Sequence, residues 1–315
     1  MNCTLCGNEK DLRVHRAREM MFGFRETFGY LHCPDCGCLA LHEVPADMGK
    51  YYPPEYYSQD DDATYPWLMR YLLRKRDRFA LQGRGLLGRW LNSLLGSQAL
   101  ASLAKLSPAP DTRILDVGCG AGSLLKSLRR MGFTRLQGAD PYNRAHIRHD
   151  EHLEIHKATI NEMKGEWDVI MLHHAFEHLQ NPLETLQQIH QRLAPNGTCL
   201  LRIPIVPSVV WDEYGVNWVQ LDAPRHYYNH SVESIRRLAH SSGFELADVV
   251  YDSTGFQFWG SELYARDIPL QQARGFKTFS KLFPMKALRE FGRRAEEANA
   301  QGRGDQAAFY LKKRK

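Results

Sequence analysis

Two pairs of cysteines near the start of the sequence have the spacing of a metal site. Cys3 and Cys6 form one Cys-x-x-Cys pair, and Cys33 and Cys36 form a second pair about 26 residues further on. Four thiolates held by two tight turns suit tetrahedral zinc, and the glycine after each pair suits a turn with positive φ. Disulfides, which need an oxidising compartment, and a redox-active thiol pair are the alternatives. We expect a closed, structural Zn²⁺ site that leaves Cys38 outside it.

A glycine-rich loop follows a short apolar segment in the middle of the sequence. The loop runs Asp116-Val-Gly118-Cys119-Gly120-Ala-Gly122, and the segment after it, 123–131, has helical periodicity. Glycines let the backbone approach a ligand closely, and the first turn of a helix offers free N–H groups. Another apolar segment ends in Asp140-Pro141, 24 residues after Asp116. The pattern predicts a nucleotide-like ligand at this loop.

Side chains suited to proton transfer gather in two further segments. One is His173-His174-Ala-Phe-Glu177-His178, and the other is Leu221-Asp-Ala-Pro-Arg-His226. Imidazole suits proton abstraction at neutral pH because its unperturbed pKa is about 6.5. The alternative is that the Glu-His pair only caps and packs the start of a helix.

The elements that position these residues alternate between strands and helices, which predicts an α/β fold with helices on both faces of the sheet. Helices are expected at 123–131, 183–193 and 231–240. A helical insertion is expected at 252–304, between the last two strands, as a cap or an oligomer contact. The expected strands of the sheet are 112–117, 135–140, 153–156, 167–172, 198–203, 244–251 and 305–313. Short strands at 12–16 and 28–32 make the cysteine module resemble a zinc ribbon.

The predicted boundaries are a cysteine module at 1–48, a connector at 49–110 and a catalytic domain at 111–315. In the connector, residues 67–95 form at least two helices divided by Gly83, Gly85 and Gly88. Seven Arg/Lys residues and one Asp lie between Trp67 and Trp90. These helices have a solvated surface, or they contact nucleic acid or an anionic membrane. The tyrosine-rich stretch 50–57 lines a site or packs onto the main domain.

The spacing Asp-x-Gly-x-Gly-x-Gly, with Asp140 and the Glu-His pair after it, resembles class I S-adenosylmethionine-dependent methyltransferases over about 112–250. The resemblance implies a Rossmann-like sheet of seven strands that ends in an antiparallel pair. It places Asp116 near the aminocarboxypropyl end of S-adenosylmethionine and Asp140 on the ribose hydroxyls. The adenine contact is left to the backbone or to Thr159. The other expected cofactor-binding residues are Gly118, Cys119, Gly120, Gly122, Pro141, His173 and His174.

Methyl transfer is an in-line displacement that usually requires removal of a proton from the acceptor. By the same resemblance, residues after the fourth strand face the methyl group. His178 is the expected base, Glu177 orients it or acts itself, and His226 is the rival base.

The acceptor is expected to be a small molecule, a nucleotide sugar or a glycan. The cysteine module, the tyrosine-rich connector and the two histidine segments together resemble bacterial sugar- and polysaccharide-modifying methyltransferases, which implies a sugar hydroxyl as the acceptor. An RNA methyltransferase is a competing hypothesis, disfavoured because no stretch alternates basic and aromatic residues as a nucleic-acid-binding sheet does. A non-catalytic zinc-dependent interaction protein is the third, disfavoured by the intact glycine loop.

The composition is that of an ordinary globular chain, with 43% hydrophobic and 24% charged residues and a formal net charge of +5. No apolar run of about 18 residues is present, which predicts no transmembrane segment. The first residues lack the pattern of a secretory signal, so a cytoplasmic location is expected. Peripheral membrane contact and the oligomeric state stay open.

Overall fold

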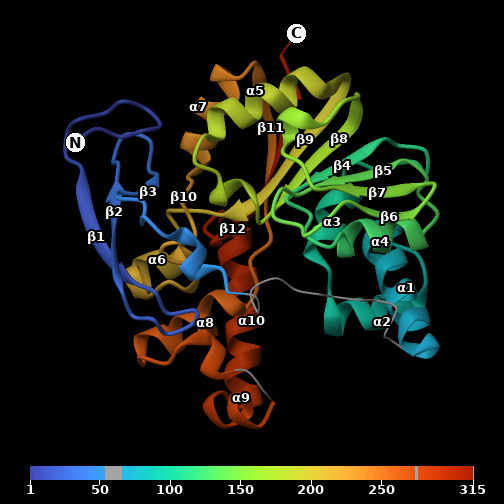
Figure 1. Ribbon diagram of the computed structural model, residues 1–315. Coiled ribbons are helices and arrows are strands. Elements are labelled where there is room, and N and C mark those ends of the chain that lie inside the picture. The colour runs from blue at the N-terminus through green and yellow to red at the C-terminus, as the bar shows by residue number, and fades with distance from the viewer. Residues whose placement is uncertain (54–65, 274–275, 315) are drawn as a thin grey trace.

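A mixed sheet of eight strands forms the centre of the molecule (Figure 1). The structure is a computed structural model that describes residues 1–53, 66–273 and 276–314. The strand order is β11-β12-β9-β8-β4-β5-β7-β6. Strands β7, β5, β4, β8 and β9 are parallel, whereas β12, β11 and β6 run antiparallel to their neighbours. The strands are β4 (Ile114–Val117), β5 (Leu136–Ala139), β6 (Ile147–Asp150), β7 (Leu153–His156), β8 (Trp167–His173), β9 (Leu193–Pro204), β11 (Phe244–Tyr251) and β12 (Gln306–Lys313).

Both faces of this sheet are buried because apolar side chains occupy successive positions of the central strands. Ile114 and Leu115 of β4 are both fully buried, yet they belong to different hydrophobic clusters, one on each face. The helices α5 (Pro182–Arg192) and α7 (Val232–Ser241) cover the face of Leu115, and α3 (Gln98–Ala104) and α4 (Ser123–Arg130) cover the face of Ile114. The predicted α/β fold with helices on both faces is therefore confirmed.

The strand order reverses direction beside β4. From β4 the chain proceeds through β5 to β7 on one side, and it then returns to β8 on the other side of β4. Such a switch point opens a crevice at the carboxyl ends of the strands, where α/β proteins bind ligands. The glycine loop follows β4, and the His-Glu-His segment follows β8, so both lie at this crevice.

A second, four-stranded sheet lies beside the first and contains the cysteine module (Figure 1). Its order is β1-β2-β3-β10, with β1 at Arg13–Arg18, β2 at Thr27–His32 and β3 at Leu39–Leu41. The fourth strand, β10 (Tyr228–Asn229), comes from the segment just after His226 and pairs antiparallel with β3. The short helices η1 (Met48–Tyr51), η5 (Phe176–His178), α6 (Val209–Tyr214), η6 (Gly215–Asn217) and η7 (Val219–Leu221) lie in the connections around this junction.

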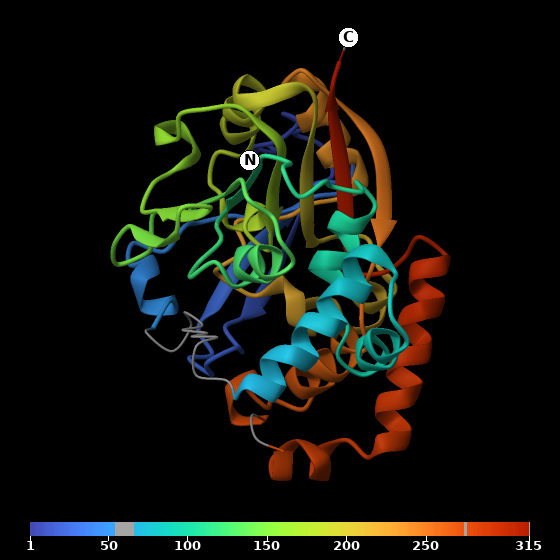
Figure 2. The ribbon, with the colours of Figure 1, turned by 90° about the vertical axis from the view of Figure 1, so that its right-hand side faces the viewer.

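Helices outside the main sheet form two groups. The connector contributes α1 (Trp67–Gln82) and α2 (Leu86–Leu95), which pack against each other and lie away from the blue N-terminal module (Figures 1 and 2). The predicted insertion between the last two strands is helical, as expected. It contains α8 (Phe256–Ala265), η8 (Leu270–Ala273), α9 (Phe276–Leu282) and α10 (Met285–Ala300).

Two local predictions were wrong, and one helix was not predicted. The main sheet has eight strands and not seven, because residues 147–150 form the edge strand β6. Helix α3 was not predicted. Gly88 does not divide two helices: it lies within α2 at the contact with α1, where a Cβ atom would be 2.3 Å from the carbonyl oxygen of Lys75. Among the residues that the structure describes, no helix is both long enough and apolar enough to cross a membrane.

Candidate functional site

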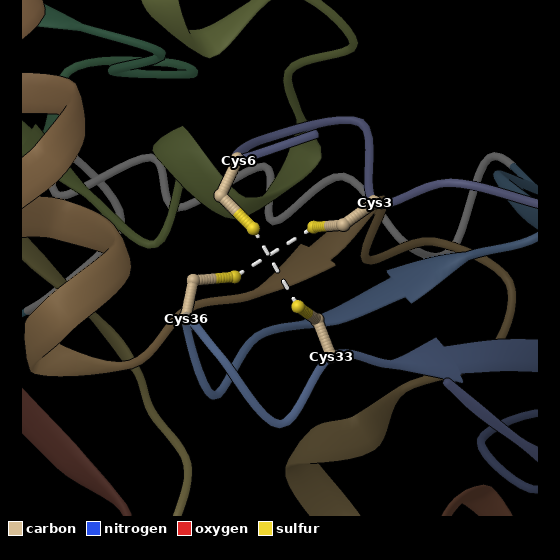
Figure 3. A group of neighbouring side chains, drawn as sticks. All are labelled: Cys3, Cys6, Cys33 and Cys36. Carbon is tan, nitrogen blue, oxygen red and sulfur yellow. Dashed lines mark hydrogen bonds between the residues drawn. The ribbon is translucent and has the colours of Figure 1, made fainter. Parts of the chain in front are cut away.

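The four predicted zinc ligands converge on one point (Figure 3). The sulfur atoms of Cys3 and Cys36 are 3.6 Å apart, and those of Cys6 and Cys33 are 3.5 Å apart. Tetrahedral zinc with Zn–S bonds of about 2.3 Å places its sulfurs about 3.8 Å apart, so the donor set fits this metal. Both knuckle glycines have the expected positive φ, 75° for Gly7 and 70° for Gly37. Cys38 is buried beside the cluster but is not one of the four converging residues.

The second cysteine pair contacts the catalytic domain directly. The hydroxyl of Ser231, which caps α7, donates a hydrogen bond to the carbonyl oxygen of Cys36. Arg237 of α7 forms an ion pair of 2.7 Å with Asp35 of the same knuckle. The knuckle of Cys33 and Cys36 is thus attached to the helix that follows the His226 segment.

The glycine loop has a tightly packed backbone shape that depends on its three glycines. Gly118, Gly120 and Gly122 all have positive φ, which only glycine adopts without strain. A Cβ atom on Gly118 would be 2.5 Å from the Cβ of Ala175, and one on Gly122 would be 2.2 Å from a methyl carbon of Ile155. The loop is therefore packed between the ends of β7 and β8.

Asp140 turns its carboxylate toward this loop. One carboxylate oxygen accepts the backbone N–H of Gly120 at 2.8 Å, and the other accepts that of Tyr142 at 2.9 Å. Asn143 donates from its side chain to the carbonyl oxygen of Gly120 at 2.8 Å. The predicted pair of loop and acid is therefore a single hydrogen-bonded unit at the ends of β4 and β5, with Pro141 exposed at its edge.

Asp116 lies at the end of β4 and is almost fully buried. Burial and, to a smaller extent, the nearby Asp140 carboxylate raise the pKa of Asp116 to about 8. Burial likewise raises the pKa of the neighbouring Cys119 thiol, which is therefore an unreactive packing group. A cationic ligand group beside Asp116 would favour its ionised form.

Thr159 lies further along the crevice and is exposed. Its hydroxyl donates to the Glu162 carboxylate at 2.9 Å as part of a capping box for η4 (Ile160–Glu162). The adenine contact assigned to Thr159 stays a prediction.

The two histidines after β8 have different surroundings. Both ring nitrogens of His173 are buried without a hydrogen-bond partner, and burial lowers its pKa to about 3. His174 has a positive φ of 50° and a half-exposed side chain whose Nε2 accepts from Arg202 at 2.8 Å. His173 is paired in the sheet with Arg202, and Asp116 of β4 is paired with Met171, two residues before His173. The assignment of both histidines to the methionine end of the cofactor stays a prediction.

Glu177 is a fully buried carboxylate surrounded by imidazoles. Neither of its oxygens has a hydrogen-bond partner, although His174 Nδ1 is 3.4 Å and His226 Nε2 is 4.0 Å from Oε1. Burial alone would raise the pKa of Glu177, but contact with His174 and the proximity of the His178 and His226 rings lower it to about 2. An ionised carboxylate with free lone pairs faces the site.

The two predicted bases, His178 and His226, lie together, with ring centroids 4.7 Å apart. His178 Nδ1 donates to the carbonyl oxygen of Arg225 at 2.9 Å, and His226 Nδ1 donates to that of Gln220 at 2.9 Å. Each ring therefore keeps its Nε2 lone pair free to accept a proton. Burial lowers the pKa of His226 to about 4, which keeps it neutral at pH 7. The Arg225 carbonyl orients His178, and Glu177 lies within 4.8 Å of both imidazoles, so the role of Glu177 toward His178 stays a prediction.

Residues near the N-terminus support these histidines, and the sequence did not indicate them. The hydroxyl of Tyr30 donates to the carbonyl oxygen of His226 at 2.8 Å. Arg225 is fully buried and donates to Asp222 at 2.6 Å and to Glu19 at 2.9 Å. Tyr52 lies 3.3 Å from His178 Nδ1 through its hydroxyl. Of these N-terminal residues, only Tyr52 belongs to a segment that the sequence singled out as one that lines a site or packs onto the main domain, the tyrosine-rich stretch 50–57. Within that stretch Tyr51 packs against Phe24 and Phe28, and Tyr52 reaches the site. Residues 54–57 lie outside the described residues.

A family model described as a methyltransferase domain matches residues 82–249 of this chain, which is more than half of it. The chain belongs to the methyltransferase domain family. The matched residues include the glycine loop, Asp140 and the His-Glu-His segment. They begin after the cysteine module, so the family match does not extend to the four converging thiols or to Glu19 and Tyr30.

The curated relatives of this methyltransferase domain include ubiquinone biosynthesis O-methyltransferases. The protein of that name from Caulobacter sp. strain K31 is 27% identical over 147 residues, which cover 40% of this chain and 58% of the relative. The protein from Roseobacter denitrificans is 28% identical over 188 residues, 53% of this chain and 73% of the relative. The match thus spans little more than half of the Caulobacter protein.

Two solved structures are similar to this chain at low identity. The mycolic acid cyclopropane synthase CmaA1 complexed with SAH and CTAB is 17% identical with a TM-score of 0.47, and the match covers 71% of this chain and 85% of that one. The cyclopropane synthase MmaA2 from Mycobacterium tuberculosis is 19% identical with a TM-score of 0.42, covering 67% and 81%.

Proposed function

We propose that this chain transfers the methyl group of S-adenosylmethionine to a hydroxyl oxygen of a small-molecule or glycan acceptor, with a sugar hydroxyl as the first candidate. The observation that carries the proposal is one juxtaposition. The Gly118–Gly122 loop packs against Ala175, so the cofactor loop and the cluster of Glu177, His178 and His226 face the same crevice.

The cofactor half of the site suits a ligand with a cationic amino group and a ribose. S-adenosylmethionine carries both. Asp116 would lie near the amino group, whose positive charge would hold the buried carboxylate ionised. Asp140 would take the ribose hydroxyls from its position against the Gly120 amide. The loop glycines Gly118, Gly120 and Gly122, with Cys119, would form the wall along the cofactor, and His173 and His174 would lie at its methionine end.

The acceptor half suits a hydroxyl group, because a hydroxyl must lose its proton when it is methylated and three possible proton acceptors converge here. His178 is the proposed base, since its free Nε2 belongs to a partly exposed ring while His226 is nearly fully buried. Glu177 would stabilise the imidazolium that forms. The names of the curated relatives, which are O-methyltransferases, also support an oxygen acceptor.

An acceptor screen tests the proposal. The purified chain is incubated with S-adenosylmethionine and separate panels of nucleotide sugars, glycans, phenols and RNA, and formation of S-adenosylhomocysteine is measured. Turnover with a nucleotide sugar or glycan is expected, and turnover with phenols alone would keep O-methylation but refute the sugar. Turnover with RNA alone would refute the proposal. Failure to bind S-adenosylhomocysteine by calorimetry would refute any methyltransferase function.

A structural zinc ion is a separate proposal. The converging thiols of Cys3, Cys6, Cys33 and Cys36 would hold it, and it would stabilise a module with a small core of its own. Mass spectrometry under native conditions should find one zinc per chain, which Cys33→Ser should lose. The matched control is Cys38→Ser, which alters a buried cysteine outside the four and should keep the metal. A wild-type chain that refolds equally well with and without zinc would contradict the proposal.

A further inference from the structure

The connector hairpin, made of α1 and α2, exposes apolar side chains to an unusual extent. Trp67 is 73% exposed, Leu86 is 85% exposed and Trp90 is 60% exposed. Leu68, Met69, Tyr71, Leu87 and Leu95 on the same two helices are also exposed large hydrophobic residues. Exposed apolar residues that are gathered on one element, and not scattered singly, mark an interaction surface.

Most arginines of the hairpin have no acidic partner among the described residues. Arg70, Arg74, Arg78, Arg84 and Arg89 form no ion pair with any residue that the structure describes. The one acidic residue of this segment, Asp77, is buried and paired with Arg76 and Arg130. The hairpin therefore presents a net positive charge together with its tryptophans and leucines.

A second segment rich in Arg and Lys, residues 271–315, pairs three of its arginines within the protein. In and after α10, Arg293 pairs with Glu290 and Glu297, Arg294 pairs with Glu213, and Arg303 pairs with Asp212. Three arginines of that segment are neutralised within the protein, whereas five arginines of the hairpin are left for an external partner.

From this contrast we propose that the α1–α2 hairpin binds the surface of an anionic lipid bilayer. Tryptophan and leucine enter the boundary between headgroups and acyl chains, and the five unpaired arginines contact the lipid phosphates. A second copy of this chain is a poor occupant because two hairpins of the same positive charge would repel each other. Nucleic acid would use the arginines but would leave the exposed leucines and tryptophans in water.

The hairpin is also well placed for this contact. Figures 1 and 2 show α1 and α2 at the periphery of the molecule, away from the N-terminal module. Asp77 of α1 forms an ion pair of 3.6 Å with Arg130 of α4. Helix α4 begins directly after Gly122, the last residue of the glycine loop. Binding at the hairpin would thus hold the crevice near the bilayer without occupying it.

Co-sedimentation of the full chain with vesicles tests the proposal. The vesicles contain either phosphatidylcholine alone or phosphatidylcholine with about one third phosphatidylglycerol. Binding to the anionic vesicles is expected, at least tenfold tighter than to the neutral ones. It should weaken at least tenfold in the double variant Leu86→Ser/Trp90→Ser and in the triple variant Arg70→Gln/Arg74→Gln/Arg78→Gln.

Matched variants elsewhere on the surface serve as controls. Met285→Ser removes an exposed hydrophobic residue of α10, 65% exposed, and Lys281→Gln/Lys286→Gln/Arg289→Gln removes the same charge as the hairpin triple variant. Both should bind vesicles like the wild type, and circular dichroism should show that every variant is folded.

Three outcomes would overturn the proposal. The first is no binding to anionic vesicles. The second is binding that the control variants lose as much as the hairpin variants do. The third is tight binding to an RNA homopolymer, or a dimer in solution, that the hairpin variants abolish while vesicle binding is unchanged. None of these measurements depends on methyl transfer, so the proposed lipid binding is tested independently of the proposed activity.

Discussion

The two halves of the crevice are built in opposite ways. The cofactor half comes from one continuous stretch, 116–143, whose loop, acid and amide groups hydrogen-bond to one another. The acceptor half comes from three distant stretches, because Glu177 and His178 follow β8, His226 precedes β10, and their support comes from Glu19, Tyr30 and Tyr52. The first half is a local structure that the main sheet positions, whereas the second also receives contacts from the N-terminal module.

The largest expected effect is on the acceptor half alone. His178→Ala should lower kcat by a factor of about 10² to 10⁴, the usual contribution of a general base, because the proton of the acceptor would have no recipient. Binding of S-adenosylhomocysteine should stay within twofold, since the cofactor half is unchanged. Steady-state kinetics and calorimetry make the two measurements.

His226→Ala tests the rival base in the same assay, and the surface variant His152→Gln is the control. The His152 substitution should leave kcat unchanged. If His178→Ala and His226→Ala both retain full activity, the base assignment is wrong.

Glu19→Gln should have the next largest effect and would test whether the N-terminal module supports the acceptor half. Both partners of the Glu19–Arg225 pair are fully buried, and breaking such a pair by removing one charge costs about 3–5 kcal/mol. We expect a lower Tm and a lower kcat with nearly unchanged S-adenosylhomocysteine affinity. The exposed Glu9→Gln is the control. An equal loss of cofactor affinity and kcat would show that the two halves are not separate.

Asp140→Ala should impair the cofactor half and not the acceptor half. Loss of two charge-assisted hydrogen bonds to the ribose should weaken S-adenosylhomocysteine binding about 100-fold or more. Vesicle binding and zinc content should not change. Asp111→Ala, an exposed acid before β4, serves as the matched control in calorimetry. An affinity within threefold of the wild type would remove Asp140 from the cofactor site.

The smallest expected effect is a pH dependence set by Asp116. Its folded-state pKa, about 8, is above its unfolded value near 3.9, so the native state binds more protons between these limits. This contribution to stability is complete at low pH and is lost as the pH rises toward 8. Asp116→Asn should therefore gain Tm relative to the wild type between pH 5 and pH 8.5 in the ligand-free protein.

Two further measurements sharpen the pH experiment. Saturating S-adenosylhomocysteine should reverse the gain, because its ammonium favours the ionised carboxylate. The exposed Asp111→Asn should show no such trend. A Tm difference for Asp116→Asn that does not vary with pH would mean that Asp116 is ionised in the native state.

The contrast between the halves also explains what the sequence could predict. The loop, Asp140 and the strands around them are indicated by local spacing, and the four cysteines by Cys-x-x-Cys pairs, so these features were found. The Glu19–Arg225 pair and the Tyr30–His226 contact join residues 206 and 196 positions apart, and no local pattern indicates them. Strand β6 was missed because its sequence, Ile-Arg-His-Asp, lacks apolar alternation; it forms because β7 offers it an edge.

The long separation of Glu19 and Arg225 has a consequence for biosynthesis. At about 5–20 residues per second, a ribosome needs roughly 10–40 s to make the 206 residues between them, so Glu19 leaves the ribosome long before its partner exists. Its carboxylate is not left bare, because it accepts the backbone N–H groups of Phe22, Gly23 and Phe24 within its own turn. These local hydrogen bonds can therefore satisfy the Glu19 carboxylate before Arg225 has been synthesised.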